Sequence, residues 1–456
     1  FFLFGSYFEI GKPEIRLSED LVAIGRQKGM EITFYDNGSG LQETTAVIVQ
    51  DDKTYPLSSV RYPEKKTSRK AISLTVDPYE MRMHDGPATL QIRAVDYSLF
   101  KNETRISRPV TIDITPPQIY PQNPQNILNP GGTGVTLFRT SEPAVMSGVM
   151  VKNQFFRIYP VTVSGKIFQN VYFALPMDAR QGVTRIKIFA RDSAFNEASL
   201  ALPHLIKSKK FRADKMSLSD TFLQQKMPDF QISNPELRGK TSLETFIHVN
   251  GQMRQDNLKT IQAITRKSDP RPLWQDTFLR MKNASPMALF GDARTYVYQG
   301  KIIGESLHEG VDLASTEHAP IEAANDGIVV LAGPLGIYGN AVMIDHGLGL
   351  FSLYGHLSTI QIQSGQPVKK GDRIGYSGVT GLAGGDHLHF SIIVGDRFVN
   401  PQAWWDPHWI ADHVTPKIAP ANRCLLYTSD APDAPHCVDP GGRRILTQQT
   451  PPTPTP

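Results

Sequence analysis

The stretch from residue 308 to residue 390 constrains the fold more than any other, because it holds six of the chain's 12 histidines. Histidine is the commonest metal ligand and the side chain that most readily moves protons near neutral pH. Three short motifs carry most of them: His308-Glu-Gly-Val-Asp312, Tyr354-Gly-His356-Leu-Ser and Asp386-His387-Leu-His389-Phe390. A fold that uses these motifs together must bring together residues about 80 positions apart.

The first motif predicts a bend in extended chain rather than a helix. Gly310 lies inside the segment HEGVDLA, which leads into strand-like residues. We therefore expect a bend at Gly310 that lets the side chains of His308 and Asp312 converge. On this geometry Glu309 points to the other side of the strand, so we do not assign it as a general base.

The third motif predicts two imidazoles side by side on a strand. Residues i and i+2 of a strand point to the same side, so His387 and His389 would share one face while Leu388 and Phe390 face a core. A catalytic zinc takes three protein ligands and leaves one position open. A lone histidine is usually an ordinary residue, so the prediction of a zinc site rests on the combination of motifs.

Five stretches carry a resemblance to a known family. They are GESLHEGVDLAS, PIEAANDGIVVLAG, YGNAVMIDHGLGLFSLYGHLS, GQPVKKGDRIGYSGVTG and DHLHFSIIV. Residues about 291–405, a quarter of the chain, resemble the lysostaphin-type (LytM-like) zinc metallopeptidase family, which cuts peptide cross-links in bacterial peptidoglycan. The resemblance implies an antiparallel β-fold with zinc in a groove between loops.

The resemblance also implies a role for each of five residues. It assigns one zinc ion (Zn2+) per catalytic domain to His308, Asp312 and His389. It assigns catalytic, non-ligand roles to His356 and His387. Because all five positions are filled, the chain differs from degenerate members of the family, which only activate other enzymes.

The expected reaction is metal-assisted hydrolysis of an amide. We expect His387 to take a proton from water and pass it to the leaving amine, and His356 to hydrogen-bond the developing oxyanion. Spacing does not decide which histidine has which role. The chain departs from the family at Asp386, where proline is usual, and at Ser391, where glutamate is frequent, but neither is a ligand position.

Three further residues are candidates for the substrate groove. The resemblance places Tyr338 and Asn340 at its rim; a simple turn at the start of a strand is the alternative. His346 is the third candidate, although the pattern Asp-His-Gly is typical of a strand that ends in a turn. His318, in the loop STEHAP, is interpreted as an ordinary residue.

The rest of the chain predicts a mostly β, multi-domain protein. Its 36 glycines and 34 prolines favour strands and turns over long helices. We predict immunoglobulin-like β-sandwiches at residues 12–115 and 116–206, a helical connector at 207–289, and a C-terminal antiparallel β metallopeptidase domain of the lysostaphin type at 290–410. A disordered tail is predicted for 411–456. The sandwiches would serve as a stalk, bind cell wall or dock partners.

An internal match supports the two sandwiches. Asp96 with Asn102 recurs as Asp192 with Asn196, in each case after a strand of the form Ile-x-Ala or Ile-Phe-Ala. We expect these side chains to hold a hairpin turn by bonds to the backbone. A calcium site is the alternative.

The connector and the end of the catalytic domain give local predictions. Thr241 and Glu244 fit a capping box at the start of a short helix, and the helical segment would either regulate the groove or merely bridge two domains. The segment FGDARTYVYQGK predicts a hairpin that leads to His308. Trp404 and Trp405 are expected to cover a core edge, with carbohydrate stacking as the alternative.

Charge and termini bear on location. A net charge of +4 and a pI near 8.8 fit an anionic wall polymer, and the absence of a dense Lys/Arg run argues against nucleic acid. The apolar start predicts that residues 1–11 are the remnant of a signal or membrane anchor, or else a short buried strand. From about residue 424 the tail resembles a translated sequencing adapter; a native disordered tail is the alternative.

These observations predict a zinc-dependent peptidoglycan endopeptidase of the cell envelope, in the periplasm and anchored or exported through the N-terminal segment. Its partners would be peptidoglycan and cell-envelope proteins that contact the sandwiches. Two other functions remain open: a non-catalytic wall-binding or amidase-activator protein, and a zinc peptidase that acts on proteins.

Overall fold

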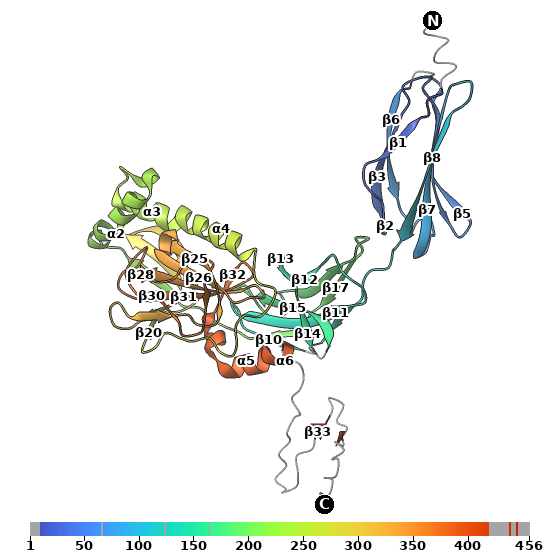
Figure 1. Cartoon of the computed structure of the whole chain (residues 1–456). Helices are drawn as coiled ribbons and strands as arrows, with labels where there is room; N and C mark the ends of the chain where they lie inside the picture. The colour runs from blue at the N-terminus through green and yellow to red at the C-terminus, as the bar shows by residue number, and fades with distance from the viewer. Residues whose placement is uncertain are drawn as a thin grey trace, which may run out of the picture.

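The computed structural model describes residues 10–64, 67–122, 125–163, 165–418, 437–438 and 444–445. The chain is mostly β, as predicted. Figure 1 shows one β-unit near the N-terminus set apart from a larger body, to which it is joined by an extended stretch of chain. In the larger body, a second β-unit, a group of helices and a C-terminal domain lie against one another.

The first β-unit consists of two facing sheets, with strand orders β1-β3-β6 and β2-β8-β7-β4-β5. Its strands are β1 (Glu14–Leu17), β2 (Ala23–Ile24), β3 (Lys28–Tyr35), β4 (Leu41–Gln50), β5 (Lys53–Arg61), β6 (Arg69–Val76), β7 (Gly86–Asp96) and β8 (Glu103–Ile112). Alternate residues of β4 and β7 are buried, which is the pattern of a sheet with one face on a core. Ile32, Ile48 and Leu90 lie in that core.

The second β-unit also has two main sheets, ordered β14-β15-β11-β9 and β13-β12-β16-β17, together with a parallel pair of short strands, β10 and β18. Its strands are β9 (Ile119–Pro121), β10 (Asn126–Leu128), β11 (Thr133–Thr140), β12 (Met146–Val151), β13 (Gln154–Arg157), β14 (Tyr159–Val163), β15 (Lys166–Ala174), β16 (Ile186–Arg191), β17 (Glu197–Ala201) and β18 (His204–Ile206). The two β-rich units are present, and their immunoglobulin-like character stays a prediction.

The predicted turn contacts are confirmed in both units. In the first, Asp96 Oδ1 accepts a hydrogen bond from the backbone N–H of Asn102 at 2.8 Å, and in the second Asp192 Oδ1 accepts one from the N–H of Asn196 at 2.9 Å. Each asparagine also donates to the chain that enters its own unit, Asn102 to the carbonyl of Gly11 and Asn196 to that of Asp113. The repeated pair therefore ties the end of each unit to its beginning.

The helical segment contains α2 (Asp220–Ser233), α3 (Ser242–His248) and α4 (Arg254–Thr265), with a π-helical turn at Val249–Met253 between the last two. The predicted capping box is confirmed: Thr241 Oγ1 accepts from the N–H of Glu244, and a Glu244 carboxylate oxygen accepts from the N–H of Thr241. Helix α3 packs Phe246 against Tyr296 of a three-stranded sheet.

That sheet has the strand order β19-β21-β22. Strand β19 (Ala213–Ser217) comes from the predicted connector, whereas β21 (Ala293–Tyr298) and β22 (Lys301–Leu307) form the predicted hairpin before His308. The sheet thus joins the helical segment to the region of the histidine motifs.

The C-terminal domain is built on a sheet with the order β20-β23-β31-β27-β26-β25-β29, to which β32 adds beside β31. These strands are β20 (Ser285–Ala288), β23 (Val311–Ala314), β25 (Gly327–Pro334), β26 (Asn340–Asp345), β27 (Leu350–Leu357), β29 (Pro367–Val368), β31 (Leu388–Val394) and β32 (Arg397–Val399). A smaller sheet contains β24 (Pro320–Glu322), β30 (Arg373–Tyr376) and β28 (Thr359–Ile360). Every pairing within these two sheets is antiparallel.

Two helices follow the C-terminal domain where the sequence predicts disorder. Helix α5 (Pro407–His413) begins at the cap residue Asp406, and α6 (Thr415–Ile418) follows it directly. Both pack inward: Val414 is fully buried, and the ammonium of Lys417 donates to Asn126 Oδ1 at 2.9 Å and to the carbonyl of Val135. The prediction of a disordered tail is therefore wrong for residues 411–418, because these apolar and hydrogen-bonded contacts order the chain.

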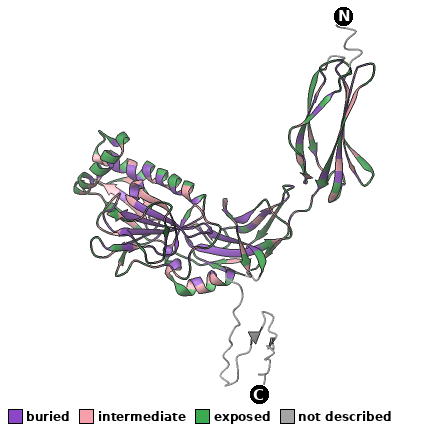
Figure 2. Ribbon diagram, in the orientation of Figure 1, coloured by how far each residue is buried: buried purple, intermediate pink, exposed green. Residues whose placement is uncertain are grey.

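One continuous apolar core runs through the second β-unit, the helical segment and the C-terminal domain, while the first β-unit has a separate core. Figure 2 shows the buried residues concentrated inside these two bodies. Trp404 links the second β-unit to the C-terminal domain: its ring meets Tyr172 at 6.0 Å and its indole N–H donates to Thr133. Of the two tryptophans predicted to cover a core edge, Trp404 lies inside the core, whereas Trp405 is partly exposed and stacks on Phe390 at 5.4 Å.

Within the described ranges, no helix is long and apolar enough to cross a membrane. Residues 1–9 of the predicted N-terminal remnant lie outside the described residues. So does the predicted adapter-like tail, apart from two short paired strands, β33 (Cys437–Val438) and β34 (Arg444–Ile445).

Candidate metal centre

Three adjacent pieces of chain bring the predicted ligands together. Asp312 on β23 and His389 on β31 are direct cross-strand neighbours in the antiparallel pairing of these strands. His308 follows β22, and the chain bends at Gly310 before it enters β23. The predicted bend and the predicted convergence of His308 with Asp312 are therefore confirmed.

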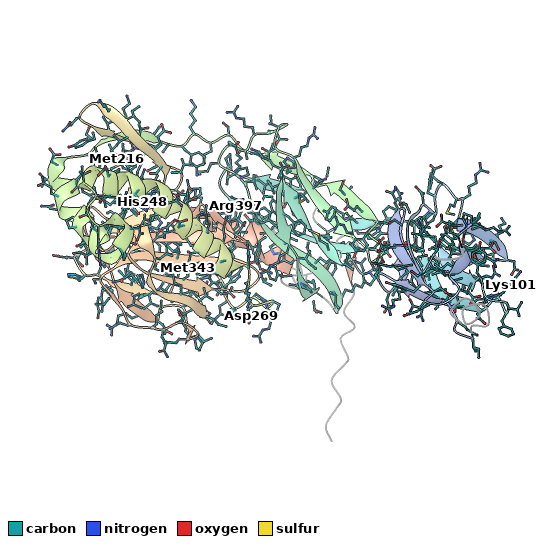
Figure 3. All side chains as sticks on the ribbon, turned by 90° about the horizontal axis from the view of Figure 1, so that it is seen from above. Lys101, Met216, His248, Asp269, Met343 and Arg397 are labelled. Atoms are coloured by element: carbon teal, nitrogen blue, oxygen red, sulfur yellow. The ribbon has the colours of Figure 1, made fainter. Side chains whose placement is uncertain are left out.

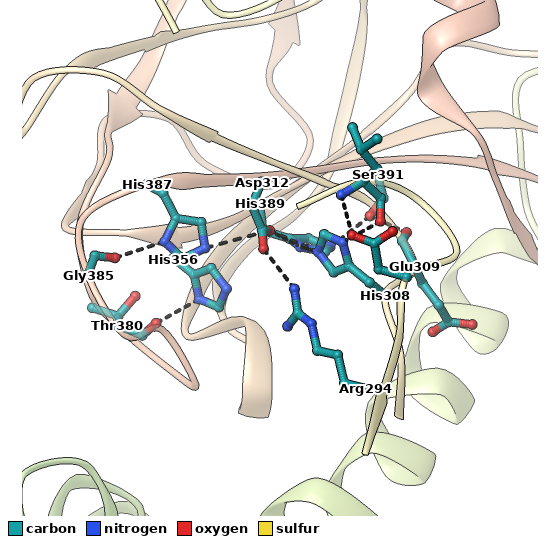
Figure 4. A network of polar contacts seen from close by, with 12 residues as sticks. Arg294, His308, Glu309, Asp312, His356, Thr380, Gly385, His387, His389 and Ser391 are labelled. Atoms are coloured by element: carbon teal, nitrogen blue, oxygen red, sulfur yellow. Dashed lines mark hydrogen bonds and ion pairs between the residues drawn. The ribbon is translucent and has the colours of Figure 1, made fainter. Parts of the chain in front are cut away.

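The three ligand atoms form a small, buried triangle (Figure 4). His308 Nε2 lies 2.9 Å from Asp312 Oδ1 and 3.1 Å from His389 Nδ1, and His389 Nδ1 lies 2.9 Å from Asp312 Oδ1. A tetrahedral ion with bonds of about 2.0–2.1 Å separates its ligands by roughly 3.3 Å. The three atoms therefore need to move by only a few tenths of an ångström to hold such an ion.

The remaining ring nitrogens of both histidines are oriented for this role. His308 Nδ1 donates to the carbonyl of Leu289 at 2.9 Å, which leaves Nε2 free of a proton. His389 Nε2 donates to Ser391 Oγ at 2.9 Å, and that hydroxyl donates in turn to the carbonyl of Glu309. Hydrogen bonds on the far side of a ring fix its tautomer and orientation in metal sites. The donor set fits a metal.

Gly310 is required by close packing around these ligands. A Cβ at this position would lie 2.6 Å from His389 Nε2 and 2.6 Å from the Ser391 hydroxyl. Any larger residue would push His389 away from Asp312.

Two further histidines stand beside the triangle, as the resemblance implies. The ring of His356, from β27, lies 4.8 Å from that of His387 and 5.9 Å from that of His389. His356 Nδ1 donates to the carbonyl of Thr380 at 2.8 Å, and His387 Nδ1 donates to that of Gly385 at 2.8 Å. In the neutral form of each ring, Nε2 is therefore the nitrogen without a proton.

The backbone at His356 is unusual. Its φ is +65°, in the left-handed region that non-glycine residues seldom occupy. Such strain concentrates at functional sites, where surrounding contacts maintain it. Here the bond to Thr380 and the packing in β27 hold the ring toward His387.

Burial and charge set the ionisation of the site. Burial alone would raise the pKa of Asp312, but its contacts with the imidazoles of His308, His387 and His389 hold that pKa well below its usual range. Burial is also the main cause that lowers the pKa of His389 to about 4 and that of His356 well below its usual value. The cluster therefore favours a neutral His389 imidazole beside the Asp312 carboxylate, a charge state that suits a cation.

Sequence reasoning missed three residues that position this site. Arg294 of β21 donates to Asp312 Oδ2 at 3.3 Å, which leaves Oδ1 for the ligand triangle. Ser391 orients His389, and Thr380 orients His356. Ser391 was accessible from strand alternation, since it lies two residues after His389, but nothing in the sequence links Arg294 to Asp312 across the hairpin.

A cavity of about 880 Å³ opens over the five functional side chains. One side comes from the C-terminal domain, including Tyr338, His356 and His387. The other comes from β19 and the helices, including Lys215 and Arg254. The helical segment therefore forms part of the groove rather than only a bridge between domains.

The three predicted groove residues have different outcomes. Tyr338 lines the cavity, as predicted. Asn340 does not line it, and its N–H donates to Thr380 Oγ1. His346 is fully buried behind the site, where Nδ1 donates to the carbonyl of Asp326 and Nε2 contacts Ser352. The groove prediction for His346 is wrong, because strand packing buries this residue behind the cavity, whereas a place for Asn340 at the groove rim stays a prediction.

A second group of acidic side chains lies where the two β-units meet. It contains Asp113, Glu142 and Asp192. Burial is the main cause that raises the pKa of Asp113 and of Glu142. Asp192 is already bonded to Asn196, and the group has no histidine. The candidate metal centre is therefore the cluster of His308, Asp312 and His389.

Three convergent candidate ligands with two further imidazoles beside them fit a site of the single-metal hydrolase class. Residues 306–401 match the model of peptidase family M23. The chain thus carries a peptidase family M23 domain at its C-terminal end, and the resemblance to LytM-like peptidases is confirmed.

Similar proteins share this domain. The DD-carboxypeptidase/endopeptidase Mpg of Neisseria meningitidis is 42% identical over 95 residues, which cover 21% of this chain and 22% of Mpg. The peptidoglycan DD-endopeptidase ShyA of Vibrio cholerae is 32% identical over 163 residues, 36% of this chain and 35% of ShyA. The murein hydrolase activator EnvC of Escherichia coli is 35% identical over 107 residues, 24% of this chain and 26% of EnvC. The matches thus span only about a fifth to a third of these relatives.

Proposed function

We propose that the chain is a zinc-dependent endopeptidase that hydrolyses peptide cross-links of bacterial peptidoglycan. The observation that carries this proposal is the convergence of His308, Asp312 and His389 beside two oriented histidines in one cavity. The names of Mpg and ShyA, an endopeptidase and a peptidoglycan endopeptidase, support the substrate.

In this function His308, Asp312 and His389 would hold the zinc ion. When bound, zinc supplies a Lewis acid that lowers the pKa of a water molecule to about 7 and polarises a carbonyl. Arg294 keeps the Asp312 carboxylate turned so that Oδ1 faces the two imidazoles. Both ligand histidines bind through the nitrogen that their outer hydrogen bonds leave unprotonated.

The other two histidines would handle the proton and the oxyanion. His387 keeps its Nδ1 proton on the carbonyl of Gly385, so Nε2 accepts the proton of the attacking water and returns it to the leaving amine. His356, whose ring Thr380 holds in place, would stabilise the developing negative charge only with a proton on Nε2. Because His356 is the more deeply buried and His387 the more accessible, this division fits proton exchange at His387.

The similarity to EnvC supports a second candidate, a non-catalytic activator of murein hydrolases. An activator needs a groove for a partner but no metal ligands. The complete ligand triangle favours the enzyme, since a buried carboxylate between two imidazoles has no purpose in a docking groove.

We also propose that the protein acts in the cell envelope, where its substrate lies, and that the two β-units are immunoglobulin-like modules that bind wall or envelope proteins. Fractionation of cells with an antibody to the C-terminal domain tests the location. Recovery of the protein with the cytoplasmic fraction would contradict it.

The decisive experiment is a digest of purified cross-linked peptidoglycan by the zinc-loaded full chain, read by mass spectrometry of the released muropeptides. We expect loss of cross-linked dimers that a zinc chelator prevents. His308→Ala should lose both zinc and cleavage, whereas His387→Ala should keep zinc and lose about 100-fold or more in rate. If the folded, zinc-loaded chain cleaves nothing, the activator function replaces the enzyme.

A further inference from the structure

Strand β19 is an edge strand that faces the cavity. It pairs only with β21, in parallel, and its other edge has no strand partner in the described part of the chain. It precedes residues 306–401, the part of the chain that matches the M23 model. An open edge of a sheet is a template for one more strand.

The alternation of backbone hydrogen bonds along β19 shows which of its N–H and C=O groups do not bond to β21. The carbonyl of Arg212 accepts from Ala293, and the N–H of Leu218 donates to the carbonyl of Val297. Because backbone groups alternate along a strand, the even-numbered residues face β21 and the odd-numbered ones face the open edge. The N–H and C=O groups of Ala213, Lys215 and Ser217 therefore point away from the sheet.

The cavity follows this edge along its length. Its lining includes Arg212 and each residue from Asp214 to Ser219, whichever face of the sheet the side chain occupies. Side chains from both faces border one cavity only where that cavity runs along the edge. Five residues of extended chain span about 16 Å, which gives room for a peptide of about that length.

The edge also begins at the metal centre. Arg212, just before β19, is hydrogen-bonded to Ala293, and the preceding residue, Asp292, accepts the N–H of His308 at 3.0 Å. A strand added beside β19 would therefore run from the candidate ligands outward along the wall of the groove. Figure 3 shows Met216 on the same side of the molecule as His248 of the helical segment and far from Lys101 of the first β-unit.

The charges along the groove favour an acidic occupant. Each lining carboxylate already has a partner: Asp214 pairs with Arg212, Asp312 with Arg294, Asp292 accepts from Leu289 and Asp386 from Ser377. Among the described residues, neither Lys215 nor Arg254 has a carboxylate within ion-pair distance. Arg254 donates to the side-chain oxygen of Asn250, and its charge partly offsets the burial that raises the pKa of Glu309. These two cations are left for carboxylates that enter the groove.

We propose that β19 is the docking strand for the substrate, and that an acidic stem peptide binds to its open edge as an added β-strand that leads to the metal. This inference rests on the proposed function and names the surface that selects an extended, acidic peptide. Backbone pairing with Ala213, Lys215 and Ser217 would provide alignment, and Lys215 and Arg254 would provide the preference for carboxylates.

Proline substitutions separate the backbone from the side chain. Two proline variants, Lys215→Pro and Ser217→Pro, each remove one outward backbone N–H together with the side chain. Their controls, Lys215→Ala and Ser217→Ala, remove the same side chains but keep the backbone N–H. Because these N–H groups do not bond to β21, the sheet retains its internal bonds. We expect each proline variant to raise KM for cross-linked muropeptides by about 3- to 10-fold over its alanine control, with kcat and zinc content unchanged. Equal KM values would overturn the inference.

Hydrogen exchange tests the same strand without cleavage. Zinc-loaded His387→Ala protein is mixed with cross-linked muropeptide released from purified peptidoglycan by a glycosidase. We expect slower exchange at the amides of Lys215 and Ser217, with those of Asp214 and Met216 unchanged. Binding without this protection, or equal binding of a neutral peptide of the same length, would overturn the inference while the endopeptidase function stands. Failure of the wild-type chain to cleave would remove both.

Discussion

The two β-units of this chain share a turn but differ in how they are buried. Each ends its last hairpin with an Asp–Asn pair that holds the incoming chain. The first unit closes its own core, whereas the core of the second continues into the C-terminal domain. Similar local sequence thus produces an independent module in one case and part of the larger body in the other. We call this larger body, formed by the second β-unit, the helical segment and the C-terminal domain, the catalytic body, after its proposed function.

The difference lies in what packs on the second unit. Trp404 inserts against Tyr172, and the N–H of Asn400 donates to the carbonyl of Gly131. Figure 3 places Arg397 where the C-terminal domain meets the second unit, and it bonds there to Gln154. These contacts come from the segment directly after β31, which carries His389, so the second unit supports the strand that holds a ligand.

The junction between the two β-units is small and polar by comparison. The N–H of Arg26 donates to Asn196 Oδ1 at 3.2 Å, and Gly25 lies so close to the carbonyl of Ala194 that a Cβ would approach it to 2.1 Å. Interfaces between domains of this polar kind permit relative motion. The first unit is therefore attached to the catalytic body without being part of its core.

Truncation should have the largest effect. It tests whether the two β-units are equally necessary for the fold of the catalytic body. A chain that starts at residue 116 should keep zinc binding and the thermal stability of the catalytic body. A chain that starts at residue 207 should lose its fold, because Trp404 and its neighbours would be exposed to water. Circular dichroism and zinc content measure both.

The contrary result is a folded, zinc-loaded chain from residue 207. It would show that the shared core is a surface contact rather than a structural requirement. Loss of zinc from the chain that starts at 116 would show that the first unit supports the site after all.

The second prediction concerns one buried side chain in each body. Trp404→Ala should destabilise the catalytic body by about 3–5 kcal/mol, because the indole is fully buried and bonded to Thr133. Ile48→Ala, in the core of the first unit, should cost about 2–5 kcal/mol. Calorimetry should show two unfolding transitions, and each substitution should lower the midpoint temperature of only one of them. A shift of both midpoints by one substitution would contradict separate cores.

The sequence predicted the catalytic body best where chemistry and periodicity coincide. A strand places residues two apart on one side, so the pairing of His387 with His389 followed from their spacing, and the glycine between His308 and Asp312 indicated the bend. The five functional residues therefore came from short-range pattern and family resemblance. Pattern and resemblance were therefore enough to predict the candidate metal centre of His308, Asp312 and His389.

The sequence failed where distant segments decide the outcome. Nothing in the sequence near residues 411–418 indicated that Val414 would be buried or that Lys417 would bond to the second unit, so disorder was predicted for these residues. The side chain of His346 contacts residues of distant segments, such as Asp326 and Phe278. Its burial depends on packing across the sheet, which a single sequence does not display.

The third prediction compares the equivalent turn residues. Asp96→Ala should cost about 1–3 kcal/mol in the first unit, because the buried N–H of Ser98 and the partly buried N–H of Asn102 lose their acceptor. Asp192→Ala should cost less in the catalytic body. Asp192 also repels Asp113, whose pKa is raised first by burial and then by this charge, so its removal offsets part of the loss. Denaturant titration measures both, and equal losses would contradict the offset.

The fourth prediction uses pH to separate the two bodies. Burial lowers the pKa of His346 to about 4, below its ordinary value of 6.5, so the unfolded chain binds a proton more readily between these values. His346 alone should therefore cost the catalytic body up to about 1.4 kcal/mol per pH unit as the pH falls from 6.5 toward 5, and the lowered pKa values of His356 and His389 act in the same direction. In the first unit, the pKa of the exposed His84 is raised, chiefly by its bond to the Asp85 carbonyl and then by Asp51, so acid does not weaken that unit through this residue.

Calorimetry at pH 7, 6 and 5 with zinc held constant tests this sign. In the wild type, the transition of the catalytic body should fall with acid while that of the first unit stays nearly constant. His346→Gln serves as the control: its body starts less stable, since a buried imidazole that bonds Asp326 and Ser352 is lost, but its pH slope should be smaller. An unchanged slope in His346→Gln would assign the acid sensitivity to other groups. The acid sensitivity of the catalytic body would then not come from this buried imidazole.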